Sequence, residues 1–437
     1  MHRRTRWLVG CFCLLALGVA VPPACGQLRG RHPELLQVTP RVWCATGYAL
    51  GNVIYVRTDE GVVVIDTTES PVAARDTLLE FRKQCDLPIT HVIYTHFHGD
   101  HINGARAFDG DKPKIIAQAL HFEEISRYRL LYEYNRRLNA IQFASSLADP
   151  EPGIALAIDA RRPVLGYLAP TVTFDEELCF ETGGIAFELR HAPGETLDQC
   201  FVWLPGERVL FPGDLFYASF PMLASPMKPD RPVLHWAQSV EKMAALDAQW
   251  MVPSHGDPVV GRDEIRSTLS NYASAIRFVH DETIKRINAG LPLEQIRREV
   301  RLPESLSSLP YLAPYYGRVE WGVNGVFRQY TGWYDLVPAH LNPGPRVERD
   351  RAIVEAAGGS ASLVARTRQA LEEGQAQLAL ELATIVLRAE PANAEAHHLS
   401  ADALDNLAAE CNNTVMRNVY RVAAQQHRET ASRTAGP

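Results

Sequence analysis

Cysteine is scarce in this sequence, and its cysteines are widely spaced. Five of the eight lie beyond the N-terminal segment, at Cys44, Cys85, Cys179, Cys200 and Cys411. A cysteine zinc site needs ligands a few residues apart, and a small disulfide-stabilised fold needs a denser, even set. The spacing argues against both. We interpret these residues as mostly buried small side chains with at most one or two disulfides.

Positive charge is also in deficit. The chain has 44 Lys and Arg against 51 Asp and Glu, a formal net charge of −7. Removing Arg3, Arg4 and Arg6 with the N-terminal segment leaves 41 basic against 51 acidic side chains, or −10. Because such a surface repels polyanions, we expect no nucleic-acid partner.

Long apolar runs are missing except at the N-terminus. Residues 1–26 combine a basic start, an apolar core from Trp7 to Val21 and the small residues Ala24 and Gly26. This layout is typical of a secretory signal peptide, and the core is shorter than the roughly 20 residues of a membrane span. We therefore expect a periplasmic or secreted protein with no integral membrane span after cleavage. Lipidation at Cys25 stays open as an alternative.

The remaining chain divides by pattern into three parts. Residues 36–262 alternate short strand patterns with helices, which predicts an α/β domain, and a helical insertion interrupts it at about 119–147. Residues 263–346 read as a helical and aromatic connector. Residues 347–430 are rich in Ala and Leu and resemble a tetratricopeptide unit, but they are too few for an independent solenoid. We expect an all-α domain that docks or dimerises.

The stretch "YTHFHGDHING" places four candidate metal ligands in six positions. His96, His98, Asp100 and His101 follow an apolar strand pattern that ends at Tyr94. Imidazole and carboxylate suit zinc, and a loop at a sheet edge is a common place for chemistry. A run of ordinary surface histidines is the alternative, but the density of donors around a flexible glycine favours metal. One short loop of this kind can supply ligands to two ions.

"THFHGDH" is similar to the signature of the metallo-β-lactamase superfamily, whose fold is an αββα sandwich that commonly holds two zinc ions. The segments "VVVID", "HAPGETLDQ", "FPGD" and "VPSHG" stand in the family order. The resemblance implies that His96 and His98 bind the first metal and that Asp100, His101 and His255 bind the second. It also implies that Asp214 bridges the two metals and that Asp66 orients a ligand from behind.

The segment "APGET" narrows the resemblance to the alkylsulfatase branch. Glu195 stands where many superfamily members have a histidine, and that branch uses a glutamate there as a metal ligand. His191 is the competing candidate, but its place matches a strand end. "YNRRLNAIQF", "YYGRVEWGVNGVFRQYTGWYDLVPAHL" and the helical tail also resemble the branch's insert, connector and dimerisation domain, so the match covers about residues 36–427.

The resemblance implies a dizinc hydrolase that cleaves alkyl sulfates to alcohol and sulfate through a metal-activated water, with the metal-held carboxylates of Asp100, Asp214 and Glu195 as catalytic groups. It also implies a homodimer and an anionic amphiphile as the substrate. A binding module with a decayed site is disfavoured because every metal ligand is present.

The sulfate-binding side chains are where this sequence departs from the branch. Relatives show an Asn and then an Arg-Gly pair after the "GD" element, where this chain has Met222 and then Met227 or Lys228. We name Tyr217, Lys228 and Arg136 as candidate substrate contacts, with Arg231 as a possible replacement cation. The departure keeps a second hypothesis open, in which the same fold hydrolyses another ester, a thioester, a phosphodiester or a β-lactam.

Overall fold

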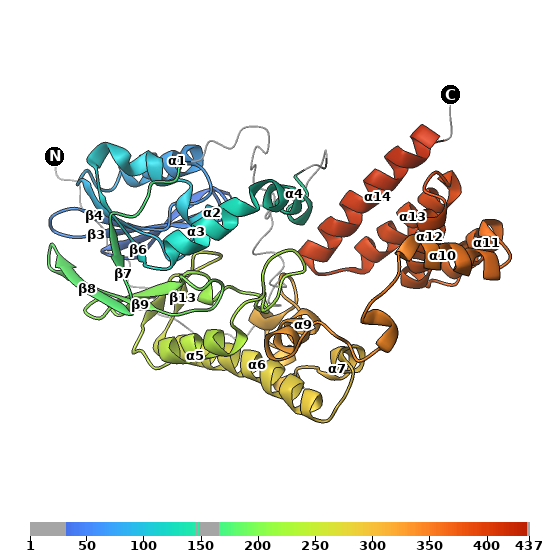
Figure 1. The fold of residues 1–437 in the computed structure, drawn as a ribbon. Helices are drawn as coiled ribbons and strands as arrows, with labels where there is room; N and C mark the ends of the chain where they lie inside the picture. The colour runs from blue at the N-terminus through green and yellow to red at the C-terminus, as the bar shows by residue number, and fades with distance from the viewer. Residues whose placement is uncertain (1–31, 146, 148–165, 435–437) are drawn as a thin grey trace, which may run out of the picture.

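Two β-sheets packed face to face form the centre of the N-terminal half of the protein (Figure 1). The computed structural model describes residues 32–145, 147 and 166–434. The first sheet contains, in spatial order, β1 (Glu34–Thr39), β2 (Val42–Thr46), β3 (Val53–Arg57), β4 (Val62–Ile65), β5 (Ile89–Ile93), β6 (Lys114–Gln118) and β7 (Val172–Phe174). The second contains β8 (Glu177–Thr182), β9 (Ile185–His191), β10 (Cys200–Leu204), β11 (Val209–Phe211), β12 (Trp250–Met251) and β13 (Val259–Val260), in the spatial order β13-β12-β11-β10-β9-β8.

The central strands are apolar on both faces because both faces are covered. In β4, Val63 and Ile65 point into the core between the sheets, whereas Val62 and Val64 point outward toward helices. The two-residue repeat of a strand produces this division. Strands buried on both sides read as continuous apolar runs, which is why "VVVI" shows no polar alternation.

Helices cover the outer face of each sheet. On the first sheet, α1 (Pro71–Phe81) packs Phe81 against Tyr55 with ring centroids 4.2 Å apart. On the second sheet, α5 (Val233–Ala244) and α6 (Arg262–Asn288) contribute buried side chains that include Trp236 and Ile265. The layers are therefore helix, sheet, sheet and helix, which confirms the αββα prediction.

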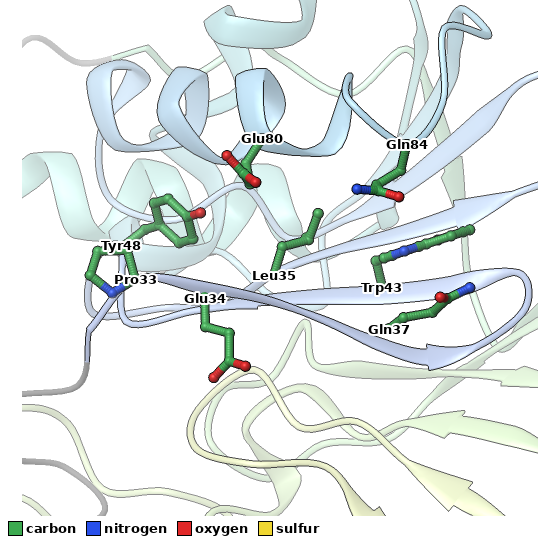
Figure 2. Close-up of a pocket in the computed structure, with 8 residues that line it drawn as sticks. All are labelled: Pro33, Glu34, Leu35, Gln37, Trp43, Tyr48, Glu80 and Gln84. Atoms are coloured by element: carbon green, nitrogen blue, oxygen red, sulfur yellow. The ribbon is translucent and has the colours of Figure 1, made fainter. Parts of the chain in front are cut away.

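Short helices and the inserted helices connect these layers. The connecting helices include α2 (Gly99–Ile102), η2 (Ala105–Asp111) and η3 (Gly213–Leu215), and the insertion forms α3 (His121–Leu130) and α4 (Tyr132–Gln142). A groove between α1 and the β1 edge is lined by Pro33, Glu34, Leu35, Gln37, Trp43, Tyr48, Glu80 and Gln84 (Figure 2). No candidate metal ligand lines that groove, so it is not the predicted metal site.

The C-terminal half is helical, as predicted (Figure 1). The connector holds α7 (Leu293–Glu299), α8 (Glu304–Ser307), η4 (Pro310–Leu312), α9 (Val319–Tyr330) and η5 (Pro338–His340). The last domain holds α10 (Arg346–Ala356), α11 (Ser360–Glu372), α12 (Ala376–Ala389), α13 (Ala394–Glu410) and α14 (Thr414–Thr434).

The final helix returns to the insertion of the catalytic domain. Asn418 on α14 donates a hydrogen bond of 2.8 Å to the backbone carbonyl of Gln142, at the end of α4. Asn413, just before α14, donates to the carbonyls of Pro314 and Tyr316 in the connector. The last domain is therefore tied to both the insertion and the connector.

The N-terminal segment falls outside the described residues. The signal-peptide prediction for residues 1–26, the export that follows from it and the Cys25 alternative therefore stay predictions. Within residues 32–145, 147 and 166–434, no helix combines the length and the apolarity that crossing a bilayer requires.

Candidate metal centre

The clustered donors lie in the loop that follows β5 and in the single turn of α2. His98 is the residue before the helix, and its carbonyl accepts a hydrogen bond of 3.0 Å from the backbone N–H of His101. Asp100 and His101 therefore project from the helical turn, whereas His96 projects from the extended chain before it. This change of backbone direction lets one short segment supply two separate groups of ligands.

Two groups of ligand atoms converge from distant parts of the sequence. The ligand atoms of His96, His101 and Asp214 lie within 4.8 Å of one another, as do those of Asp100, His101 and His255. His255 Nε2 lies 3.4 Å from Asp100 Oδ2 and 3.3 Å from Asp214 Oδ2. His101 Nε2 lies 3.5 Å from each of the same two oxygens.

The remaining two predicted ligands extend the first group. His98 Nδ1 lies 2.9 Å from His96 Nε2 and 3.6 Å from Glu195 Oε1. His96 Nε2 in turn lies 4.0 Å from Asp214 Oδ2. The structure thus brings all seven sequence-predicted ligands into one cluster, with Asp214 between the two groups.

Hydrogen bonds on the far side of two histidine rings orient those rings toward the cluster. His101 Nδ1 lies 2.8 Å from Asp66 Oδ2, and His255 Nδ1 lies 3.0 Å from the carbonyl oxygen of Leu50. Both partners only accept hydrogen bonds, so each Nδ1 carries a proton and Nε2 is the ring atom that faces the cluster and is free to bind a metal. Among the described residues, His101 Nε2 and Asp214 Oδ1 are buried without any hydrogen-bond partner. Cations held between these atoms would satisfy them, so the donor set fits two metal ions.

The electrostatics of the cluster point the same way. Burial alone would raise the pKa of Asp214, but His255 and His101 hold it well below its ordinary value. Burial lowers the pKa of His96 and His98 well below the ordinary value, which keeps both neutral, the form that binds a metal. Burial also opposes protonation of His101 and His255, but Asp214 and Asp100 raise the pKa of both well above the usual value. The cluster therefore favours added positive charge.

Asp66 supports the centre from behind, as predicted for a residue that orients a ligand. Its carboxylate accepts hydrogen bonds from the Thr95 backbone N–H (2.9 Å), the Thr95 hydroxyl (2.9 Å) and the Ser254 hydroxyl (2.6 Å), besides its contact with His101. Its φ of 54° is unusual for a residue other than glycine. Sequence reasoning missed Thr95 and Ser254, although each directly precedes a predicted ligand.

A glycine shapes the backbone just before Asp214. Asp214 follows β11 on η3, and Gly213 before it has a φ of 57°. A Cβ at Gly213 would stand 2.5 Å from Gln199 Nε2 and 2.8 Å from the Thr95 side chain. Only glycine combines this conformation with this contact, which explains the "GD" pair in "FPGD".

Glu195 lies in the cluster, and His191 does not. Glu195 is 4% exposed, and its second oxygen forms an ion pair with Arg231 Nη1. His191 Nε2 instead lies 2.8 Å from the carbonyl oxygen of Leu197. The His191 ring is therefore hydrogen-bonded to the loop backbone. The geometry thus favours the glutamate over the histidine as the ligand at this position.

Arg231 has a role that the sequence did not reveal. Its guanidinium lies 5.6 Å from the centre of the Trp236 ring and pairs with Glu195, and the whole residue is 4% exposed. The hydroxyl of Tyr217 donates to Glu195 Oε2 over 3.5 Å and accepts from the Met222 backbone N–H over 2.8 Å. Arg231 and Tyr217 therefore hold a metal-ligand candidate, and the expectation that they contact substrate stays a prediction.

The other two predicted substrate contacts differ from each other. Lys228 is half-buried beside the cluster, where burial and the nearby Arg231 lower the pKa of its ammonium group. Arg136 is exposed on α4 and pairs with Glu133 over 3.0 Å on the same helix. Lys228 is thus placed to meet an anion, whereas the partner of Arg136 among the described residues lies on the surface of the same helix.

Comparison with known proteins agrees with this geometry. Residues 47–255 match the family model of the metallo-β-lactamase superfamily, and residues 293–430 match that of alkyl sulfatase dimerisation. The second match begins inside the region that the sequence analysis assigned to the connector.

Individual relatives extend over most of the chain. A linear primary-alkylsulfatase from Pseudomonas sp. is 30% identical, covering 85% of this chain and 73% of its own length. An (R)-specific secondary-alkylsulfatase from Pseudomonas sp. is 28% identical over 90% of this chain and 62% of its own length. The solved structure of a stereoselective inverting sec-alkylsulfatase from Pseudomonas sp. aligns with a TM-score of 0.83 and 27% identity, covering 91% of this chain and 66% of that one. The chain therefore belongs to the alkylsulfatase branch of the metallo-β-lactamase superfamily.

Proposed function

We propose that this protein is a dizinc hydrolase that converts alkyl sulfate esters to an alcohol and inorganic sulfate. The observation that carries the proposal is the convergence of seven donors, with Glu195 in the place of a histidine, in a chain whose relatives are named alkylsulfatases. The chain spans 62% to 73% of the length of these relatives. A single chain of this kind would hold two ions.

Each side chain of the centre has a distinct task in this proposal. His96, His98 and Glu195 would hold one zinc, and Asp100, His101 and His255 the other, with Asp214 between them. Bound zinc lowers the pKa of water toward neutrality and so supplies a nucleophile at ordinary pH. The Asp214 carboxylate lies in contact with both donor groups, so it would hold the two ions at a fixed separation.

Lys228 is one cation placed to meet the sulfate. Arg231 pairs with Glu195 through Nη1 while its Nη2 is buried without a hydrogen-bond partner, and no hydrogen-bond or ion-pair partner of the Lys228 ammonium occurs within the described parts of the chain. Burial beside Arg231 lowers the pKa of Lys228, so an incoming anion would relieve an unfavourable charge. A lysine binds as a flexible point charge and lacks the fork of an arginine, so we expect tolerance toward the shape of the anion.

Replacing Lys228 tests this anion contact. A Lys228→Met variant should raise KM for an alkyl sulfate about 10- to 100-fold, because one charge-assisted hydrogen bond is lost. Lys228→Arg should keep most of the affinity, and Lys242→Met, at an exposed position on α5, is the matched control. Unchanged KM in Lys228→Met would remove this residue from the substrate site.

A panel of substrates tests the reaction itself. The zinc-loaded protein should release inorganic sulfate from primary or secondary alkyl sulfates, and His98→Ala should abolish the release. If the panel is inert while a β-lactam, thioester or phosphodiester is turned over in a His98-dependent manner, the second hypothesis replaces the first. Met222, and Met227 or Lys228, stand in place of the family's sulfate contacts, and this departure is the reason for including these other substrates.

We infer that the protein is a homodimer. The match of residues 293–430 to a dimerisation family supports this, as does the connector, where Trp333, Leu336 and Leu341 are 73%, 64% and 58% exposed. Sedimentation equilibrium should return twice the mass of one chain at micromolar concentration. A single-chain mass throughout that range would contradict the inference.

A further inference from the structure

A buried histidine–aspartate pair lies outside the set of metal-ligand candidates. His121 is the first residue of α3, and Asp198 lies in the loop between β9 and β10. His121 Nδ1 is 3.1 Å from Asp198 Oδ2, and the two residues are 0% and 1% exposed. Burying a carboxylate costs free energy unless it is hydrogen-bonded, so the partners of Asp198 explain why it is buried here.

The partners of Asp198 lead to Glu195. The other carboxylate oxygen, Oδ1, accepts a hydrogen bond of 2.6 Å from the hydroxyl of Thr196, the residue next to Glu195. The carbonyl of Thr196 accepts from the Gly194 backbone N–H over 3.1 Å, which closes a tight turn around Glu195. Asp198 therefore stabilises the turn that carries Glu195 at the metal centre.

The imidazole of His121 is held in one orientation. An ionised carboxylate only accepts hydrogen bonds, so Nδ1 carries the proton and donates it to Asp198. Nε2 then accepts from the Tyr167 hydroxyl, 3.3 Å away. The ring stacks on Tyr94 and Tyr167 with centroid distances of 5.6 and 5.8 Å. Since Tyr94 lies two residues before His96, this packing joins the Glu195 turn to the segment that carries the clustered histidines.

We propose that His121 and Asp198 are positioning residues that hold Glu195 in its ligand geometry. Glu195 is drawn in two directions, since one oxygen pairs with Arg231 and the other lies 3.6 Å from His98 Nδ1. The hydrogen bond from Thr196 to Asp198 holds the turn in place. Glu195 can then pair with Arg231 without its carboxylate moving away from the metal centre. The inference rests on the ligand role of Glu195 in the proposed function.

Two substitutions of similar size separate this role from a general packing role. In His121→Asn the side-chain amide reaches the place of Nδ1 and can still donate to Asp198, whereas in His121→Gln it reaches the place of Nε2. Both variants lose the ring and its stacking. Zinc affinity, measured by competition with a chromophoric chelator, should fall about 10- to 100-fold in His121→Gln and remain within about threefold of the parent in His121→Asn. Equal losses in both variants, or no loss in either, would overturn the proposal.

A double-mutant cycle checks that the effect passes through Glu195. In a Glu195→Ala background, His121→Gln should cause no further loss of zinc affinity, because the residue that it positions is gone. A full additive loss would show that His121 acts elsewhere and would overturn the proposal. Because the probe is zinc alone, the result does not depend on which ester the protein hydrolyses, so failure of the sulfatase assay is distinguishable from failure of this inference.

Discussion

Asp214→Asn should lower kcat/KM for an alkyl sulfate by more than about a thousandfold. Asp214 Oδ2 lies 3.3 to 4.0 Å from the Nε2 atoms of His96, His101 and His255, so this carboxylate touches both groups of donors. Asparagine keeps the shape but removes the negative charge that would offset two bound zinc ions. Elemental analysis should show zinc falling from about two ions per chain in the parent to fewer than two in the variant.

The control for Asp214→Asn is a variant that loses one carboxylate charge at a position outside the donor cluster. Asp263 is exposed in the first turn of α6, and Asp263→Asn should leave both zinc content and kcat/KM unchanged. Asp214→Asn with full zinc content and activity within tenfold of the parent would rule out a bridging role. Full zinc content with the activity lost would instead keep Asp214 as a catalytic group and remove it from the ligand set.

Arg231→Met should lower the free energy of unfolding of the metal-free protein by about 3–5 kcal/mol. Removing one member of a buried ion pair leaves the other charge uncompensated, which costs more than the intact pair contributes. Burial raises the pKa of Glu195 to about 7 even with Arg231 beside it, so the carboxylate has little other compensation. Urea denaturation at pH 8, where the Glu195 carboxylate of the parent is mainly ionised, measures the loss.

Two further variants test the assignment of this cost. Glu195→Gln combined with Arg231→Met should recover much of the stability, because no buried charge is left unpaired. Arg328 pairs with Asp230 at a half-exposed position, so Arg328→Met should cost no more than about 1 kcal/mol. An equal small cost for Arg231→Met and Arg328→Met would contradict a buried, coupled pair.

The part of the site that was predictable from sequence is the part with chemistry in its local pattern. His96, His98, Asp100 and His101 lie within six positions, and their donor types alone point to metal. Glu195, Asp214 and His255 were assigned only through resemblance to a family, because a single Glu, Asp or His carries no such signal. The structure then brought them within ligand distance of the cluster.

The substrate side of the site shows where local pattern is insufficient. Lys228, Arg231 and Arg136 look equivalent in sequence, as cations near a site with an expected anionic substrate. The fold assigns them different partners: Arg231 is buried against Glu195, Arg136 pairs with Glu133 on a helix surface, and Lys228 lies beside the cluster. Charge type was predictable, but the partner of each charge was not.

Sequence by itself determined the layered α/β fold, the helical C-terminal half and the metal-binding loop, because strand and helix periods and closely spaced ligands are properties of neighbouring residues. Tertiary structure alone decided which cation pairs with Glu195 and which lies beside the cluster. It also decided that His121 stands behind the Glu195 turn. The physical reason is that these contacts join residues separated by tens to hundreds of positions. Their energies depend on burial and distance, and no local pattern records either of these.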